Sequence, residues 1–166
     1  MQNDVKKMSL SKQFIIDGIL SAILVLLGMI KLPSLFPGAE FQLSAPYAVC
    51  LAYMVGFKRY LGIGICSSII QLLLGTHTIW NVVIAMVFRI VAGLIVEFGR
   101  RYRLAVIVAG PIGTGCARLV IAYMLQVPAW PLVVAAVPGM VFTAVGVLFV
   151  IPMVERALKY SGLSLQ

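Results

Sequence analysis

Six apolar runs, separated by short segments that carry charge or proline and glycine, dominate this sequence. They cover approximately residues 14–30, 45–57, 60–74, 78–98, 104–125 and 131–158. Hydrophobic residues make up 62% of the 166 residues and charged residues 11%. A soluble domain carries roughly a quarter charged residues, whereas each membrane-spanning helix needs about 20 apolar ones. We therefore expect an all-α membrane protein, with residues 1–166 forming a single domain of six transmembrane helices.

The second and third runs are short for a membrane span, because the hydrocarbon core is roughly 30 Å thick. Only Lys58 and Arg59 separate them. A tight turn between two helices is the favoured interpretation, and one longer core helix is the alternative.

Lysine and arginine are distributed unequally between the two sets of alternating connections. One set, together with both termini, holds Lys6, Lys7, Lys12, Lys58, Arg59, Arg100, Arg101, Arg103, Arg156 and Lys159. The other set holds only Lys31. Because cytoplasmic loops are enriched in positive charge, this predicts that the N and C termini are both cytoplasmic. The expected location is the cell membrane, as a multi-pass protein of a prokaryotic plasma membrane.

Several classes of function lack the residues that they need. The sequence contains no GxxxxGK[ST], HExxH or GxSxG motif, so we expect neither an enzyme nor an ATPase. Its three cysteines lie inside apolar runs without metal-ligand spacing, so no metal and no cofactor are expected. The net charge of +8 comes largely from the loops, which argues for a lipid bilayer and against nucleic acid as the partner.

Two arginines lie deep inside apolar runs. Arg89 follows Trp80 by nine residues and Arg118 precedes Gln126 by eight. At 1.5 Å per residue, each is about 12–13 Å below the predicted external end of its helix. A charge at that depth costs at least about 2.5–3.5 kcal/mol, so it is expected to be paired or to line a wet cavity.

The carboxylates do not supply partners for these two arginines. Four of the five lie in the N-terminal tail or near predicted cytoplasmic helix ends, and only Glu40 lies in an external loop. An anionic ligand held by Arg89 or Arg118 would balance the charge, since arginine suits carboxylate and phosphate. Alternatively, the arginines bind backbone carbonyls or water, or extend to one membrane face.

Aromatic and polar side chains accompany the arginines near the predicted external side. His77, Trp80 and Asn81 have helical spacing and share a face with Arg89 further along the same run. Trp80 is interpreted either as a ring contact for a ligand or as an interfacial anchor, whereas an anchor is favoured for Tyr123. Interruptions at 110–111 and 138–139 mark either a binding site or a packing kink.

In these features the chain resembles the substrate-binding S component of an energy-coupling factor (ECF) vitamin transporter. Size, six runs and a long first external loop match. Local matches are residues 37–43 before the second run, residues 74–76 with Asn81, and a small-residue pair, Gly18 and Ala22, on the first helix. The family has alanine at the first position of that pair, so Gly18 is a departure that bears on the strength of the helix contact.

The resemblance implies an S-component-like bundle that captures a vitamin, a precursor or a similar micronutrient. Its partners would be a transmembrane coupling (T) subunit, contacted by Gly18, Ser21 and Ala22 of the first helix, and two cytoplasmic ATPase subunits. The ligand would bind between the outer halves of the fourth to sixth helices and the external loops. That region holds Glu40, Gln42, His77, Trp80, Asn81, Arg89, Arg118, Tyr123 and Gln126.

The favoured ligand is small, anionic and ring-bearing, with Arg89 or Arg118 holding its anion and Trp80 contacting its ring. The alternative function is a six-span subunit of a cell-envelope assembly machine that resembles MreD. Such a subunit would need no polar pocket and would bind no small molecule.

Overall fold

The computed structural model describes residues 10–32, 41–99 and 102–161, without the side chains of residues 31, 32, 41, 42 and 157–161. Its elements are α1 (Leu10–Met29), β1 (Lys31–Leu32), β2 (Phe41–Gln42), α2 (Ser44–Val55), α3 (Phe57–Leu73), α4 (Ile79–Gly99), α5 (Arg103–Leu125) and α6 (Ala129–Ser161). One helix occupies each predicted apolar run. The all-helical prediction is confirmed, apart from the antiparallel pairing of the two-residue strands β1 and β2 in the connection between α1 and α2.

Within the described residues, four helices are long and apolar enough to cross a membrane: α1, α4, α5 and the Ala129–Arg156 part of α6. The chain is therefore a multi-pass membrane protein. By contrast, α2 has 12 residues and α3 has 17. At 1.5 Å per residue α2 is only about 18 Å long, so six complete spans remain a prediction.

The chain turns sharply between α2 and α3. Gly56 has a φ of 80° and separates the two helices, a backbone conformation that glycine adopts without steric cost. The predicted turn is thus confirmed and the single longer helix is wrong. The break nevertheless comes earlier than expected, because Lys58 and Arg59 lie in the first turn of α3.

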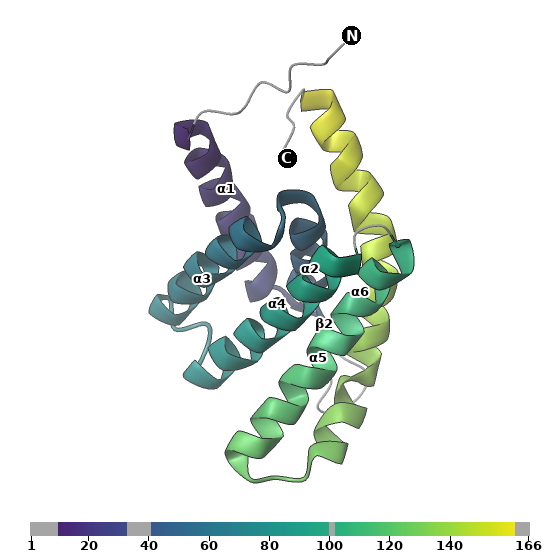
Figure 1. The fold of residues 1–166 in the computed structure, drawn as a ribbon. Helices are drawn as coiled ribbons and strands as arrows, with labels where there is room; N and C mark the ends of the chain where they lie inside the picture. The colour runs from purple at the N-terminus through teal and green to yellow at the C-terminus, as the bar shows by residue number, and fades with distance from the viewer. Residues whose placement is uncertain (1–9, 33–40, 100–101, 162–166) are drawn as a thin grey trace.

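The five other helices surround α2. Contacts join α1 to α3, α3 to α4, α4 to α5 and α5 to α6, and α2 contacts all five. Val49, Cys50, Leu51 and Ala52 in its middle are at most 1% exposed, as expected for a helix that is apolar on every side. Figure 1 shows the start of α1 and the end of α6 at the same end of the molecule, with the α5–α6 turn at the opposite end.

The outer surface of the helices is apolar. Phe14 of α1, Phe98 of α4 and Phe149 of α6 are more than 70% exposed. The interior instead contains polar side chains, including Ser67 and Gln71 of α3. This distribution suits lipid around the protein, where polar groups must find partners between helices.

One arginine joins α4 to α3. The side chain of Arg89 crosses above Gly64 and donates hydrogen bonds from Nη1 to Ser68 Oγ and from Nη2 to Ser67 Oγ, the latter 3.1 Å long. Its Nη1 also lies 3.8 Å from the sulfur of Met86. Arg89 is only 5% exposed, so these contacts supply a buried cation with hydrogen-bond acceptors in the protein.

The close approach of Arg89 to Gly64 leads to a stability prediction. A Cβ at position 64 would lie 2.6 Å from Cδ of Arg89 and 2.9 Å from its Nε, whereas one at the exposed Gly62 would meet nothing within 4 Å. We expect Gly64→Val to displace Arg89 from the two serines and to destabilise the fold by about 1–3 kcal/mol. Thermal unfolding in detergent measures this, with Gly62→Val as the matched control. Equal melting temperatures for the two variants would contradict the prediction.

The predicted orientation is testable with cysteine labelling. In a background in which Cys66 and Cys116 are replaced by alanine, Gln126→Cys in the α5–α6 turn should react with a membrane-impermeant maleimide on intact cells. Lys58→Cys, at the start of α3, should react only after permeabilisation, because the positive-inside rule places it in the cytoplasm. Both positions are exposed. The reverse pattern of labelling would show that the charge-based orientation is inverted.

Candidate functional site

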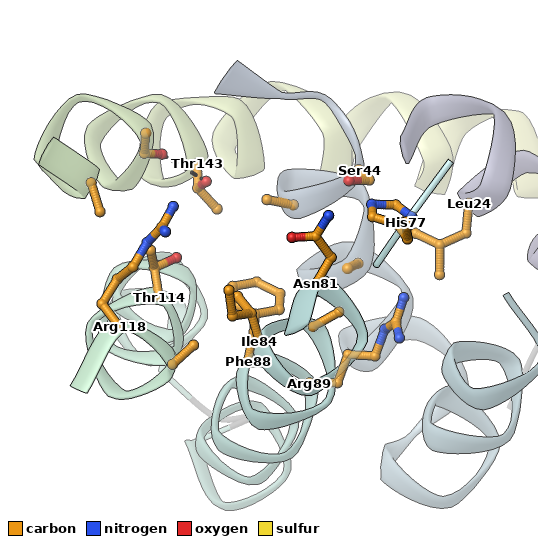
Figure 2. A pocket seen from close by; sticks show the side chains of 16 residues that line it. Leu24, Ser44, His77, Asn81, Ile84, Phe88, Arg89, Thr114, Arg118 and Thr143 are labelled. Carbon is orange, nitrogen blue, oxygen red and sulfur yellow. Dashed lines mark hydrogen bonds between the residues drawn. The ribbon is translucent and has the colours of Figure 1, made fainter. Parts of the chain in front are cut away.

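A cavity of about 250 Å³ lies between α2, α4, α5 and α6 (Figure 2). Its lining combines small, apolar and polar side chains: Leu24, Ser44, Ala45, Ala48, His77, Asn81, Ile84, Ala85, Phe88, Arg89, Thr114, Ala117, Arg118, Ala136, Gly139 and Thr143. Pockets for drug-sized ligands occupy roughly 300–1,000 Å³, so this volume suits a smaller molecule. These residues come from the helix ends that the charge pattern predicts to be external.

Four of the residues singled out from the sequence line this cavity together: His77, Asn81, Arg89 and Arg118. His77 belongs to the turn before α4, whereas Asn81 and Arg89 lie two helical turns apart on one face of α4. Arg118 comes from α5. In Figure 2, Arg118 and Arg89 lie on opposite sides of Asn81. The helical spacing thus identified one wall, and the packing of α5 against α4 brought the second arginine to the same cavity.

Three other candidates do not line the cavity. Trp80 is 44% exposed and Tyr123 is 79% exposed. The side chain of Gln126 is exposed and its Nε2 donates to the carbonyl oxygen of Tyr123 at 2.8 Å. The structure therefore supplies no ring contact from Trp80 and places Phe88 of α4 in the lining instead. The difference arises because Trp80 precedes Asn81 by one residue, a rotation of about 100° around the helix.

The remaining two candidates, Glu40 and Gln42, belong to the connection between α1 and α2. Glu40 lies outside the described residues, and only the backbone of Gln42 is described, paired with that of Lys31. Strand β2, which contains Gln42, contacts α6. The loop therefore returns to the bundle beside one of the helices that line the cavity.

Sequence reasoning missed several polar lining residues, among them Ser44, Thr114 and Thr143. Thr114 lies four residues before Arg118 and so shares its helix face. Thr143 lies four residues after Gly139, whose carbonyl oxygen accepts a 2.8 Å hydrogen bond from Thr143 Oγ1. Both four-residue spacings are visible in the sequence and could have identified the two threonines. Ser44 had no such signal, because only the tertiary structure places the start of α2 at the cavity.

The sequence interruptions in α5 and α6 do not break either helix. Both helices run through their internal prolines, Pro111 and Pro138. Gly110 packs directly against the methyl group of Thr143, and Gly139 lines the cavity. The two interruptions therefore differ: the first permits close packing of α5 on α6, and the second forms part of the pocket wall.

The cavity is electropositive. It is lined by two arginines, and among the described residues no aspartate or glutamate lines it. Asp17 instead forms a 2.6 Å ion pair with Arg59, and Glu97 accepts a 3.3 Å hydrogen bond from the first backbone N–H of α3. Within the described residues, the charge that would balance Arg89 and Arg118 is thus absent from the cavity walls, which favours an anionic ligand.

Helix α1 presents small residues to the outside. Gly18 and Ala22 are exposed, and a Cβ at Gly18 would meet nothing within 4 Å. Ser21, expected beside them at a partner interface, is instead 4% exposed and donates a 3.1 Å hydrogen bond to the carbonyl oxygen of Ile63 in α3. The structure therefore divides the three residues between an outward face and an internal helix contact.

Comparison with known proteins finds a relative of similar chain length. The chain is 50% identical over 129 residues to the protein named BioX from Lysinibacillus sphaericus. The aligned segment covers 78% of each of the two chains. No family model matches the chain. No solved structure matches it either. Identity of this level over most of both chains shows common descent, and the chain therefore belongs to the BioX family.

Proposed function

We propose that this chain is the substrate-binding S component of an ECF-type transporter and captures a small, biotin-related carboxylic acid for ATP-driven uptake. The single observation that carries the proposal is the electropositive cavity, which two arginines line without a described carboxylate. The name of the relative, BioX, suggests biotin and related acids as the first ligands to test. The resemblance in helix number and loop pattern supports the transporter class.

The size and lining of the cavity support a ligand of vitamin size. A volume of about 250 Å³ lies below the range of drug-sized pockets, roughly 300–1,000 Å³, which favours a ligand smaller than a dinucleotide. Ile84, Ala85 and Phe88 provide apolar surface between the two arginines. A molecule with an apolar body and an acidic group matches this combination of walls.

The outward face of α1 supports a partner helix. Gly18 and Ala22 lie four residues apart and are exposed, and small residues allow close helix approach within lipid. We assign this face to the coupling subunit, and ATP hydrolysis to separate ATPase subunits. Ser21 would act indirectly, by holding α1 against α3.

Binding to the purified protein tests the proposal. Biotin and other vitamins, their acid precursors and amino acids should be added singly to the detergent-purified chain during thermal unfolding. A ligand that binds only the folded state, at a thousandfold excess over Kd, stabilises it by about 4 kcal/mol. We expect biotin or an acid of its class to raise the melting temperature, and its uptake by cells to require co-produced coupling and ATPase subunits.

The same measurement separates the competing functions. A flat response from folded protein across the panel would contradict the proposal and favour an envelope-assembly subunit. Binding without any dependence of uptake on ATPase subunits would retain the binding site and reject the ECF mechanism.

A further inference from the structure

We propose that the two cavity arginines have different roles: Arg118 binds the acidic group of the ligand, whereas Arg89 is a positioning residue that holds α4 against α3. This inference rests on the proposed function, because it concerns the same cavity. The two roles determine how the ligand would lie in the cavity and which residue would give the protein its specificity for an acid. The two arginines differ in the hydrogen-bond partners of their guanidinium nitrogens.

The terminal nitrogens of Arg89 are already engaged by α3. Nη1 donates to Ser68 Oγ and Nη2 donates to Ser67 Oγ, and both serines are at most 4% exposed. Carboxylate binding by arginine typically uses two parallel N–H groups of the planar fork. One N–H on each terminal nitrogen of Arg89 is thus used by a buried serine, so the fork formed by Nη1 and Nη2 is directed at α3. Its charge therefore adds to the positive potential of the cavity, while its hydrogen bonds serve the α3–α4 contact.

Arg118 is in the opposite situation. Among the described residues, its Nε is a buried atom without a hydrogen-bond partner, and none of their carboxylates lies beside it in the cavity lining. Figure 2 shows its guanidinium extending from α5 into the cavity, on the side where Thr143 of α6 lies. A buried, unsatisfied donor on a charged group carries a desolvation cost that a bound anion would remove. This makes Arg118 the donor available to a ligand.

The neighbouring hydroxyl group supports the same assignment. Thr143 is 2% exposed and its Oγ1 donates its hydrogen to the carbonyl oxygen of Gly139 at 2.8 Å. With that hydrogen engaged, the hydroxyl oxygen can only accept, so Thr143 does not compete with Arg118 for a carboxylate. The hydroxyl of Thr143 therefore does not donate to an anion at the α6 wall, and Arg118 is the cationic donor beside it.

The assignment fixes the orientation of the ligand. Its acidic group would lie beside α5, and its apolar body would extend past Ile84 and Phe88 of α4. The other end would reach Asn81, whose side-chain amide offers both a donor and an acceptor. Figure 2 shows this amide within the cavity, between the two arginines. A ligand with an acid at one end and a neutral hydrogen-bonding group at the other satisfies this order.

Matched acid and amide probes test the inference. The probes are biotin with biotinamide, nicotinate with nicotinamide, and tryptophan with tryptophanamide, each titrated against detergent-purified protein. For a pair that binds the wild-type chain, we expect the acid to bind roughly 10- to 100-fold more tightly than the amide, as loss of hydrogen bonds to a charged group implies. Arg118→Gln should abolish this preference, and Arg118→Lys should retain only part of it.

Arg89→Lys is the matched control, because it keeps the charge and removes the fork that binds the serines. It should lower the melting temperature of the ligand-free protein while retaining the preference for the acid. Arg118→Gln should not lower that temperature, because it removes an unsatisfied buried donor. The ligand-free comparison therefore tests the structural role of each arginine without any ligand.

The outcomes separate this inference from the proposed function. An acid preference that persists in Arg118→Gln, or no preference in the wild-type chain, would overturn the role of Arg118 while leaving the binding function intact. If no probe binds the wild-type chain, the proposed ligand class fails. In that case the ligand-free melting temperatures decide: a loss for Arg118→Gln as large as that for Arg89→Lys would give Arg118 a structural role and reject the inference.

Discussion

Polar groups inside a lipid-surrounded bundle must be satisfied by the protein itself, and this constraint governs the structure. Arg89 illustrates it, because its guanidinium obtains acceptors from Ser67 and Ser68 of the adjacent helix. The fit requires Gly64, since a side chain there would occupy the path of the arginine. A buried charge, two hydroxyl groups and a missing side chain thus form one unit that fixes α3 against α4.

The cavity follows from the length of the central helix. At 12 residues, α2 is about 18 Å long, whereas the hydrocarbon core that its neighbours can cross is roughly 30 Å thick. The longer helices α4, α5 and α6 extend alongside it, and the start of α2 contributes Ser44, Ala45 and Ala48 to the cavity wall. The cavity therefore lies where the start of a short central helix meets three longer ones.

In the proposed binding site, specificity and stability oppose each other. The hydrogen bonds of Arg89 support the helix packing, whereas the Nε of Arg118, which has no hydrogen-bond partner among the described residues, is unfavourable in the ligand-free protein. Groups reserved for a ligand are characteristically less well satisfied than groups that hold a fold together. The contrast between two arginines in one cavity is the physical basis for assigning them separate roles.

The sequence by itself determined the six helices, the turn before α3 and the approximate position of both arginines along their helices, because apolar run length and helical rise are local properties. Helical spacing also placed Asn81 and Arg89 on one face. The tertiary structure decided which helix faces meet. It directed Trp80 and Tyr123 away from the cavity and brought Ser44 and Thr143 into its lining. It also placed the buried serines of α3 within hydrogen-bond distance of Arg89 rather than of Arg118. Those outcomes depend on how each helix is rotated against its neighbours, and that rotation is set by side-chain packing between segments distant in sequence.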